Sequence, residues 1–88
     1  MYWVVVFVLY DDFRSVINNR DDKAIVEFGK RLASLRKSKG MTQEELTDKA
    51  GLSKNMIGNI ERGEVNTTLS TMGHIAEALE IPLKELMG

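Results

Sequence analysis

Two short helical segments follow each other in the middle of the chain, and the connection between them is very short. Thr42 and Glu45 have the spacing of a capping box, in which each side chain bonds to the backbone of the other residue at the start of a helix. Gly51 is expected to end this helix, Ser53 to cap the next one, and Gly63 to end that one. Because only about three residues connect the two helices, they must cross steeply rather than run antiparallel.

Apolar residues at helical spacing continue on both sides of this pair. Spacings of three and four residues predict a first helix over residues 22–38, followed by Gly40, and a fourth helix over residues 69–80. Pro82 fits the start of a short fifth helix. The apolar residues expected to face the core are Ile25, Phe28, Leu32, Leu35, Leu46, Ala50, Ile57, Ile60, Leu69, Met72, Ile75, Ala76, Leu79, Leu83 and Leu86.

The N-terminal segment follows a different pattern. Residues 2–10 form an uninterrupted apolar run rich in Val and aromatic residues, which favour extended backbone. The run is too short to cross a membrane, which takes about 20 apolar residues in a helix. We therefore predict an N-terminal β-strand and connector over residues 1–21, followed by an all-α domain of five helices over residues 22–88.

A lone strand needs a partner for its backbone N–H and C=O groups. The rest of the sequence contains no second strand-like run, so we expect the partner strand to come from a second copy of the chain. Trp3, Val5 and Phe7 would then lie in the dimer contact. The alternative is a segment that only packs on the helical domain.

The residue counts exclude several kinds of site. The chain has no Cys and one His, so disulfides, Cys-ligated metals and thiol nucleophiles are excluded, and His-based sites are poorly supplied. Twelve basic against 13 acidic residues give a net charge of −1, so nucleic-acid binding would require a local patch. The sequence also lacks a glycine-rich phosphate loop. We expect no enzymatic activity, no cofactor and no metal.

Two short helices joined by a glycine turn have the form of a helix-turn-helix, whose second helix enters the major groove of DNA. The residues expected to face outward from that helix are Lys54, Asn55, Gly58 and Asn59. Asn can pair with adenine through two hydrogen bonds, and Lys can donate to guanine, while Gly58 would allow close approach to the groove. Lys54, Asn55 and Asn59 are therefore the candidate base-contacting residues.

Three segments together resemble the Xre/Cro phage-repressor family, whose members have a lambda-repressor-like helix-turn-helix domain. They are Thr42–Leu46, the turn Gly51–Ser53, and Ile57–Glu64. The resemblance covers about residues 25–87. The stretch Gly51–Ser70 also resembles the controller proteins of restriction–modification systems and many small bacterial repressors.

The resemblance implies roles for individual residues. It implies that Arg36 and Glu61 form a buried ion pair that orients the second helix of the motif. It also implies that the fifth helix, through Leu83 and Leu86, contributes to a dimer, and closure of the core is the alternative role of these residues. The residues that would contact DNA phosphates are Gln43, Ser53, Arg62, Asn66 and Thr67.

Two residues depart from the family pattern. The family usually has Ala where this chain has Thr47, at the close contact between the two helices of the motif, so the crossing of the helices is expected to adjust. It often has Pro where this chain has Thr67, so the loop before the fourth helix is expected to be less rigid. Neither change removes a group expected to contact DNA.

The leading functional prediction is a sequence-specific DNA-binding transcriptional regulator in the bacterial cytoplasm, acting as a homodimer on an inverted-repeat site. The alternative prediction is an antitoxin-like or other protein-interaction module, in which residues 2–10 add to the sheet edge of a partner protein. The two predictions are compatible, since an antitoxin can also bind DNA.

Overall fold

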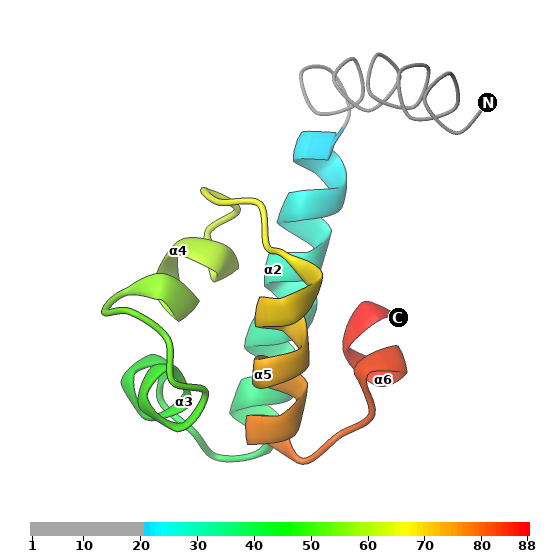
Figure 1. The fold of residues 1–88 in the computed structure, drawn as a ribbon. Coiled ribbons are helices and arrows are strands. Elements are labelled where there is room, and N and C mark those ends of the chain that lie inside the picture. Colours follow the sequence, from blue (N-terminus) through cyan, green and yellow to red (C-terminus); the bar gives the residue numbers. More distant parts are fainter. Residues whose placement is uncertain (1–20) are drawn as a thin grey trace, which may run out of the picture.

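The computed structural model describes residues 21–88, which form five helices and contain no strand. These are α2 (Asp21–Ser38), α3 (Gln43–Lys49), α4 (Met56–Glu61), α5 (Leu69–Leu79) and α6 (Leu83–Met87). The long α2 runs through the molecule, with α3 and α4 on one side and α6 on the other (Figure 1). Helix α5 overlaps α2 in this view and packs against α3 and α6. The all-α prediction is confirmed for these residues. The predicted N-terminal strand lies outside them.

All five helices contribute to one hydrophobic core. Its fully buried side chains are Leu32, Leu46, Ile57, Ile60, Ile75, Leu79 and Leu86. Burial of each such side chain stabilises the fold by about 1.5–3 kcal/mol. The core therefore fixes the short helices α3, α4 and α6, which are too short to be stable in isolation.

Local capping signals set the boundaries of α3, as predicted. The Glu45 backbone N–H donates to Thr42 Oγ1 at 3.0 Å, and the Thr42 N–H donates to Glu45 Oε1 at 2.8 Å. Gly51 follows the helix with φ +69°, a left-handed conformation in which Gly is favoured because it has no Cβ. This conformation turns the chain toward α4.

The predicted start of α4 is wrong. Ser53 does not cap the helix. The Met56 N–H donates to the Ser53 carbonyl at 3.1 Å, which forms a separate turn before the helix. The N-cap is Asn55, with φ +68°, a left-handed conformation that Asn adopts more readily than most side chains. Helix α4 is consequently short, and its first turn is preceded by an exposed polar loop.

The predicted burial of Leu69 is also wrong. Leu69 is the first residue of α5, where Thr68 caps the helix, and its side chain is 62% exposed. Met72, one turn further on, is only half-buried, and full burial begins at Ile75. The hydrophobic core does not extend to the first turn of α5. The helical spacing of apolar residues in the sequence therefore begins one turn before the part of α5 that is packed in the core.

Glycine allows α2 and α4 to approach closely. Gly29 is buried on α2, and a Cβ at this position would lie 2.8 Å from the Glu61 carbonyl oxygen and closer still to that of Ile60. The end of α4 therefore rests directly on the backbone of α2. None of the helices in residues 21–88 combines the length and the apolar character that a membrane span requires.

Candidate nucleic-acid interface

A buried ion pair connects α2 to the last residue of α4. Arg36 Nε lies 2.6 Å from Glu61 Oε2, and Arg36 Nη2 lies 3.0 Å from Glu61 Oε1, so the contact is bidentate. The Arg36 and Glu61 side chains are only 10% and 6% exposed. Arg36 Nη1 also donates to the Met41 carbonyl at 2.7 Å. The hydrogen bonds to Glu61 raise the pKa of the Arg36 guanidinium.

The same carboxylate also contacts α3. Gln43, the first residue of α3, donates from Nε2 to Glu61 Oε1 at 2.8 Å. One side chain of α4 therefore bonds both to α2 and to the start of α3. Thr47, at the contact between α3 and α4, is buried and donates its hydroxyl to the Gln43 carbonyl at 2.7 Å. This bond satisfies the additional polar group that Thr introduces there.

Two of the three candidate base-contacting residues lie just before the start of α4, and Asn59 lies on the helix. Lys54 and Asn55 are exposed in the loop before α4 rather than on the helix. The Asn55 side chain makes no capping hydrogen bond, so both the oxygen and the NH2 group of its side-chain amide are available. Asn59 is half-buried on α4, and Arg62 Nη2 donates to its Oδ1 atom.

Arg62 connects Asn59 to an acidic residue that lies beyond α4. Its Nε and Nη2 atoms lie 2.9 and 3.3 Å from Oε2 and Oε1 of Glu64. Glu64 raises the pKa of the Arg62 guanidinium through these bonds. Both side chains are more than half exposed, so the pair is accessible from solvent. Arg62 is thus available to a phosphate only in competition with Glu64.

Gly58 does not face outward, contrary to the prediction. It is buried, and a Cβ there would lie 3.1 Å from both Gln43 Oε1 and Arg62 Nη1. These side chains and Gly58 line a polar cavity of about 500 Å³ between α3 and α4, together with Glu44, Thr47, Asp48, Lys54 and Asn55. Gly58 therefore provides space for Gln43 and Arg62 rather than for a DNA base.

The other predicted residues are not all available to a partner. Ser53 and Asn66 are exposed, but the Thr67 hydroxyl is buried, so Thr67 can approach a phosphate only through its backbone. Leu86 is fully buried in the core of its own chain, which corrects its assignment to a dimer contact, whereas Leu83 is half-buried. Trp3, Val5 and Phe7 lie outside the described residues.

The sequence analysis missed three features of this region. The bond from Gln43 to Glu61 depends on how the helices cross, and no sequence signal indicates it. Glu64 lies two residues after Arg62 with opposite charge, which is a weak signal for a pair. The third feature is the close contact at Gly29. Gly29 lies four residues after Ile25 and three before Leu32, so it is a small residue on the apolar face of α2, and this spacing is the signal that could have indicated a close helix contact.

Within residues 21–88 no group of three or more His, Cys, Asp or Glu side chains is arranged to hold a metal ion.

Comparisons with known proteins agree with this geometry. The immunity repressor protein of Bacillus phage phi105 is 38% identical over 60 residues, which are 68% of this chain and 42% of that repressor. Control protein C.BamHI of Bacillus amyloliquefaciens is 36% identical over 61 residues, covering 68% of this chain and 75% of that protein. The chain therefore spans less than half the length of the phage repressor.

A solved structure and a family model give the same result. The crystal structure of the restriction-modification controller protein C.AhdI from Aeromonas hydrophila superposes with a TM-score of 0.71 at 41% identity, covering 73% of this chain and 97% of that one. A family model described as helix-turn-helix matches residues 32–86, which include α3, the turn and α4. The chain belongs to the helix-turn-helix family.

Proposed function

We propose that this chain is a sequence-specific DNA-binding transcriptional regulator that acts as a homodimer on an inverted-repeat site in the bacterial cytoplasm. The start of α4 and the loop before it would enter the major groove. Relatives that are named as an immunity repressor and as control proteins support a regulatory role.

One observation carries the proposal. Lys54 and Asn55 are exposed in a turn that leads directly into α4, while the opposite end of α4 is held by the buried Arg36–Glu61 pair. Polar, unpaired side chains thus lie at the start of a helix, α4, whose other end is bonded to both α2 and α3. A surface of this kind suits base contacts, because the backbone that carries the side chains needs little reordering when DNA binds.

The side chains differ in how ready they are for base contacts. Both amide groups of Asn55 are available to pair with adenine N6 and N7. Asn59 would first have to release the Arg62 guanidinium from its Oδ1 atom. We propose that Arg62 then moves to a DNA phosphate, so that contact with the backbone and contact with the base occur together.

The remaining contacts position the domain. We propose that Gln43, Ser53 and Asn66 contact phosphates on either side of the groove, with Gln43 held in place by Glu61. A single α4 of six residues can contact only a few base pairs. Two copies with their α4 helices about 34 Å apart would contact an inverted repeat, and the half-buried Leu83 of α6 is the proposed dimer contact.

The test is selection from a pool of random DNA duplexes at moderate salt. We expect the wild-type chain to enrich an inverted repeat, Lys54→Ala to weaken binding to it, and Asn55→Ala to lose the preference at one position in each half. Lys49→Ala is the matched control, because Lys49 is an exposed lysine that pairs with Glu80 and belongs to neither the proposed DNA contacts nor the proposed dimer contact. If no sequence is enriched, or if Lys54→Ala and Lys49→Ala behave alike, the proposal is wrong.

A further inference from the structure

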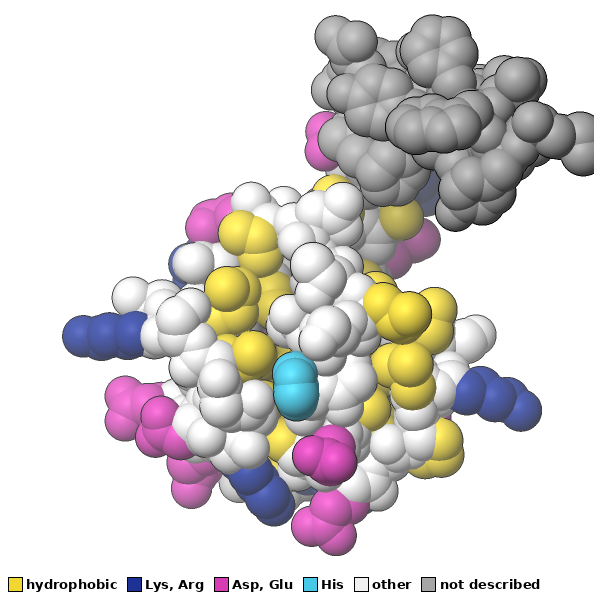
Figure 2. Space-filling view, in the orientation of Figure 1, with side chains coloured by type: hydrophobic (Ala, Val, Ile, Leu, Met, Phe, Trp, Pro, Cys, Tyr) yellow, Lys and Arg dark blue, Asp and Glu magenta, His cyan; other side chains and the backbone are white. Residues whose placement is uncertain are grey.

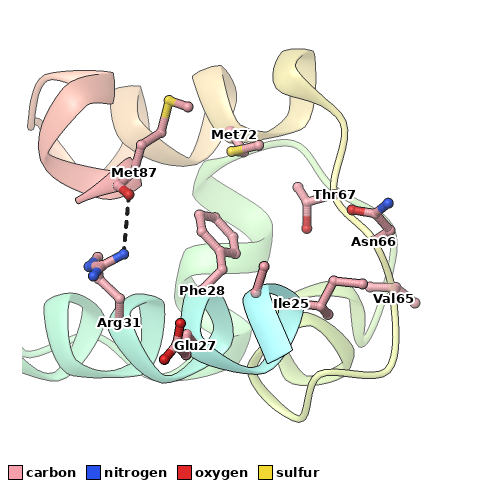
Figure 3. Close-up of a pocket in the computed structure, with 10 residues that line it drawn as sticks. Ile25, Glu27, Phe28, Arg31, Val65, Asn66, Thr67, Met72 and Met87 are labelled. Carbon is pink, nitrogen blue, oxygen red and sulfur yellow. Dashed lines mark hydrogen bonds between the residues drawn. The ribbon is translucent and has the colours of Figure 1, made fainter. Parts of the chain in front are cut away.

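A mostly apolar groove lies between the N-terminal half of α2, the loop before α5, and α6, and Glu27, Arg31 and Asn66 also line it. Its volume is about 450 Å³, and Ile25 and Phe28 of α2 form one wall. Val65 and Thr67 from the loop before α5 form another, and Met72 of α5 and Met87 of α6 close it (Figure 3). The groove shares no lining residue with the cavity between α3 and α4, although Asn66, a proposed phosphate contact, also lines the groove.

Several side chains that line the groove are left partly exposed to solvent, and one buried hydroxyl has no hydrogen-bond partner among the described residues. Phe28, Val65 and Met72 are only half-buried, and Met87 is 52% exposed. The Thr67 hydroxyl is buried in its wall without a hydrogen-bond partner among the described residues, although buried hydroxyls are normally paired. Figure 2 shows that apolar side chains reach the surface in separate groups on one face of the molecule.

We propose that the groove binds the N-terminal apolar segment of the same chain, through the side chains of Trp3, Val5 and Phe7. This segment has the composition that the groove requires, because residues 2–10 are all aliphatic or aromatic. The contact would tie α2, α5 and α6 together and would cover the segment, which would otherwise be prone to aggregation.

The length of the chain allows this contact. Residues 11–20 separate the segment from Asp21, where α2 begins, and they can span up to about 33 Å. Phe28 lies only about 10 Å along α2 from Asp21. The part of the groove from Ala24 to Arg31 is also about 10 Å long. Alternate residues in extended chain lie about 7 Å apart, so two neighbouring side chains of the three fit within this length and the third reaches its edge.

The short connector also favours this occupant over a second copy of the chain. A segment joined by about ten residues is present at its own groove at an effective concentration in the millimolar range. A segment from another copy would match this only at millimolar protein concentration. The inference therefore departs from the intermolecular strand pairing expected from the sequence. It does not depend on the proposed DNA binding.

Trp3 is the only tryptophan of the chain, so its fluorescence reports on the segment alone. The full chain should show blue-shifted Trp emission and weak quenching by acrylamide. Val65→Glu and Met87→Glu should shift the emission to the red and increase quenching, because each places a charge in the groove. Leu69→Glu is the matched control, since Leu69 is exposed and does not line the groove. Circular dichroism would verify that each variant remains helical.

A second measurement applies even if the groove variants unfold. In Trp3→Ala the methyl resonances of Met72 and Met87 should move, because the ring current of Trp3 is lost, whereas that of Met41, which lies outside the groove, should not. Solvent-like Trp3 emission in the wild type, or burial of Trp3 that the groove variants leave unchanged, would overturn the proposal. So would burial that disappears on dilution, since this would place the segment on a second copy.

Discussion

At the scale of single residues, Glu61 determines how the candidate DNA-contacting surface is held. Its carboxylate bonds to Arg36 of α2 and to Gln43 of α3, and it lies at the end of α4. The pair is nearly buried, so removing one partner leaves a charge in a site that water hardly reaches. Loss of Glu61 should therefore affect both stability and the position of Gln43.

We expect Glu61→Gln to lower the free energy of unfolding by about 3 kcal/mol, because the Arg36 guanidinium then remains buried without a counter-charge. Urea denaturation measures this change. Lys49→Gln is the control: Lys49 pairs with Glu80 at 3.5 Å on the surface, and its loss should cost less than about 1 kcal/mol. Equal effects of the two substitutions would show that the Arg36–Glu61 pair is not buried in solution.

Glu64 is expected to weaken DNA binding. Its carboxylate bonds to Arg62 and adds a negative charge next to the proposed phosphate contact. Glu64→Gln should therefore tighten binding to the selected DNA site by about three- to tenfold at low salt, with a smaller gain at high salt. Titration of labelled duplex measures the effect. Weaker binding by Glu64→Gln would show that Glu64 positions Arg62 for the phosphate instead of withholding it.

The pH dependence of stability should include a contribution from the capping box. The Thr42 backbone N–H and hydroxyl lower the pKa of Glu45 in the folded chain below the ordinary value of a Glu carboxyl. A lowered folded pKa means that the stabilisation is fully present above about pH 5 and is lost as pH falls through the folded pKa. The stability difference between wild type and Glu45→Gln should accordingly shrink as pH decreases below 4.5. The range from about pH 6 to about pH 3 includes the ordinary pKa of a Glu carboxyl. If the stability difference between wild type and Glu45→Gln stays constant over this range, Glu45 does not stabilise the fold through its charged form.

At the scale of elements, the close packing of α2 against α4 depends on Gly29. A Cβ at this position would meet the carbonyl oxygens of Ile60 and Glu61, which are backbone atoms and cannot move independently of α4. Any larger residue must therefore displace the helix that carries Asn59.

Gly29→Ala should lower the free energy of unfolding by about 1–3 kcal/mol, as overpacking of a core contact does. Gly73→Ala on α5 is a matched control, because no atom lies within 4 Å of a Cβ there and φ is not positive. It should raise stability by about 0.5–1 kcal/mol through helix propensity. Thermal denaturation of both variants tests the contact, and equal stabilisation by the two substitutions would show that α4 does not rest on Gly29.

Local signals in the sequence were sufficient to predict most elements. The capping box at Thr42 and the positive φ at Gly51 involve neighbouring residues only, so their effect is visible in the sequence. The start of α4 was not predictable in this way. Ser53 has the composition of a cap, but the turn that ends at Met56 bonds to its carbonyl instead.

The candidate site was predictable in its composition but not in its contacts. Lys54, Asn55 and Asn59 were selected by spacing from the turn, and the structure places the first two just before the start of α4 and Asn59 on the helix. The bond between Arg62 and Asn59 and the burial of Gly58 depend on the crossing of α3 and α4, which the sequence does not specify.

At the scale of the whole molecule, the net charge of −1 provides no general attraction to DNA. Charged side chains of both signs are spread over the face shown in Figure 2 rather than gathered into a basic surface. Affinity must therefore come from a limited set of phosphate contacts and from base contacts, and it should decrease steeply with salt.

The most direct test of the account is to measure binding of wild type, Asn55→Ala and Gln43→Ala to every single-base variant of the selected site. Asn55→Ala should lose discrimination at one base pair in each half-site, while Gln43→Ala should weaken all sites equally and reduce the salt dependence by about one phosphate contact per copy. If Asn55→Ala keeps the wild-type affinity and the same preference at every position, the turn before α4 does not contact bases, and the central claim is wrong.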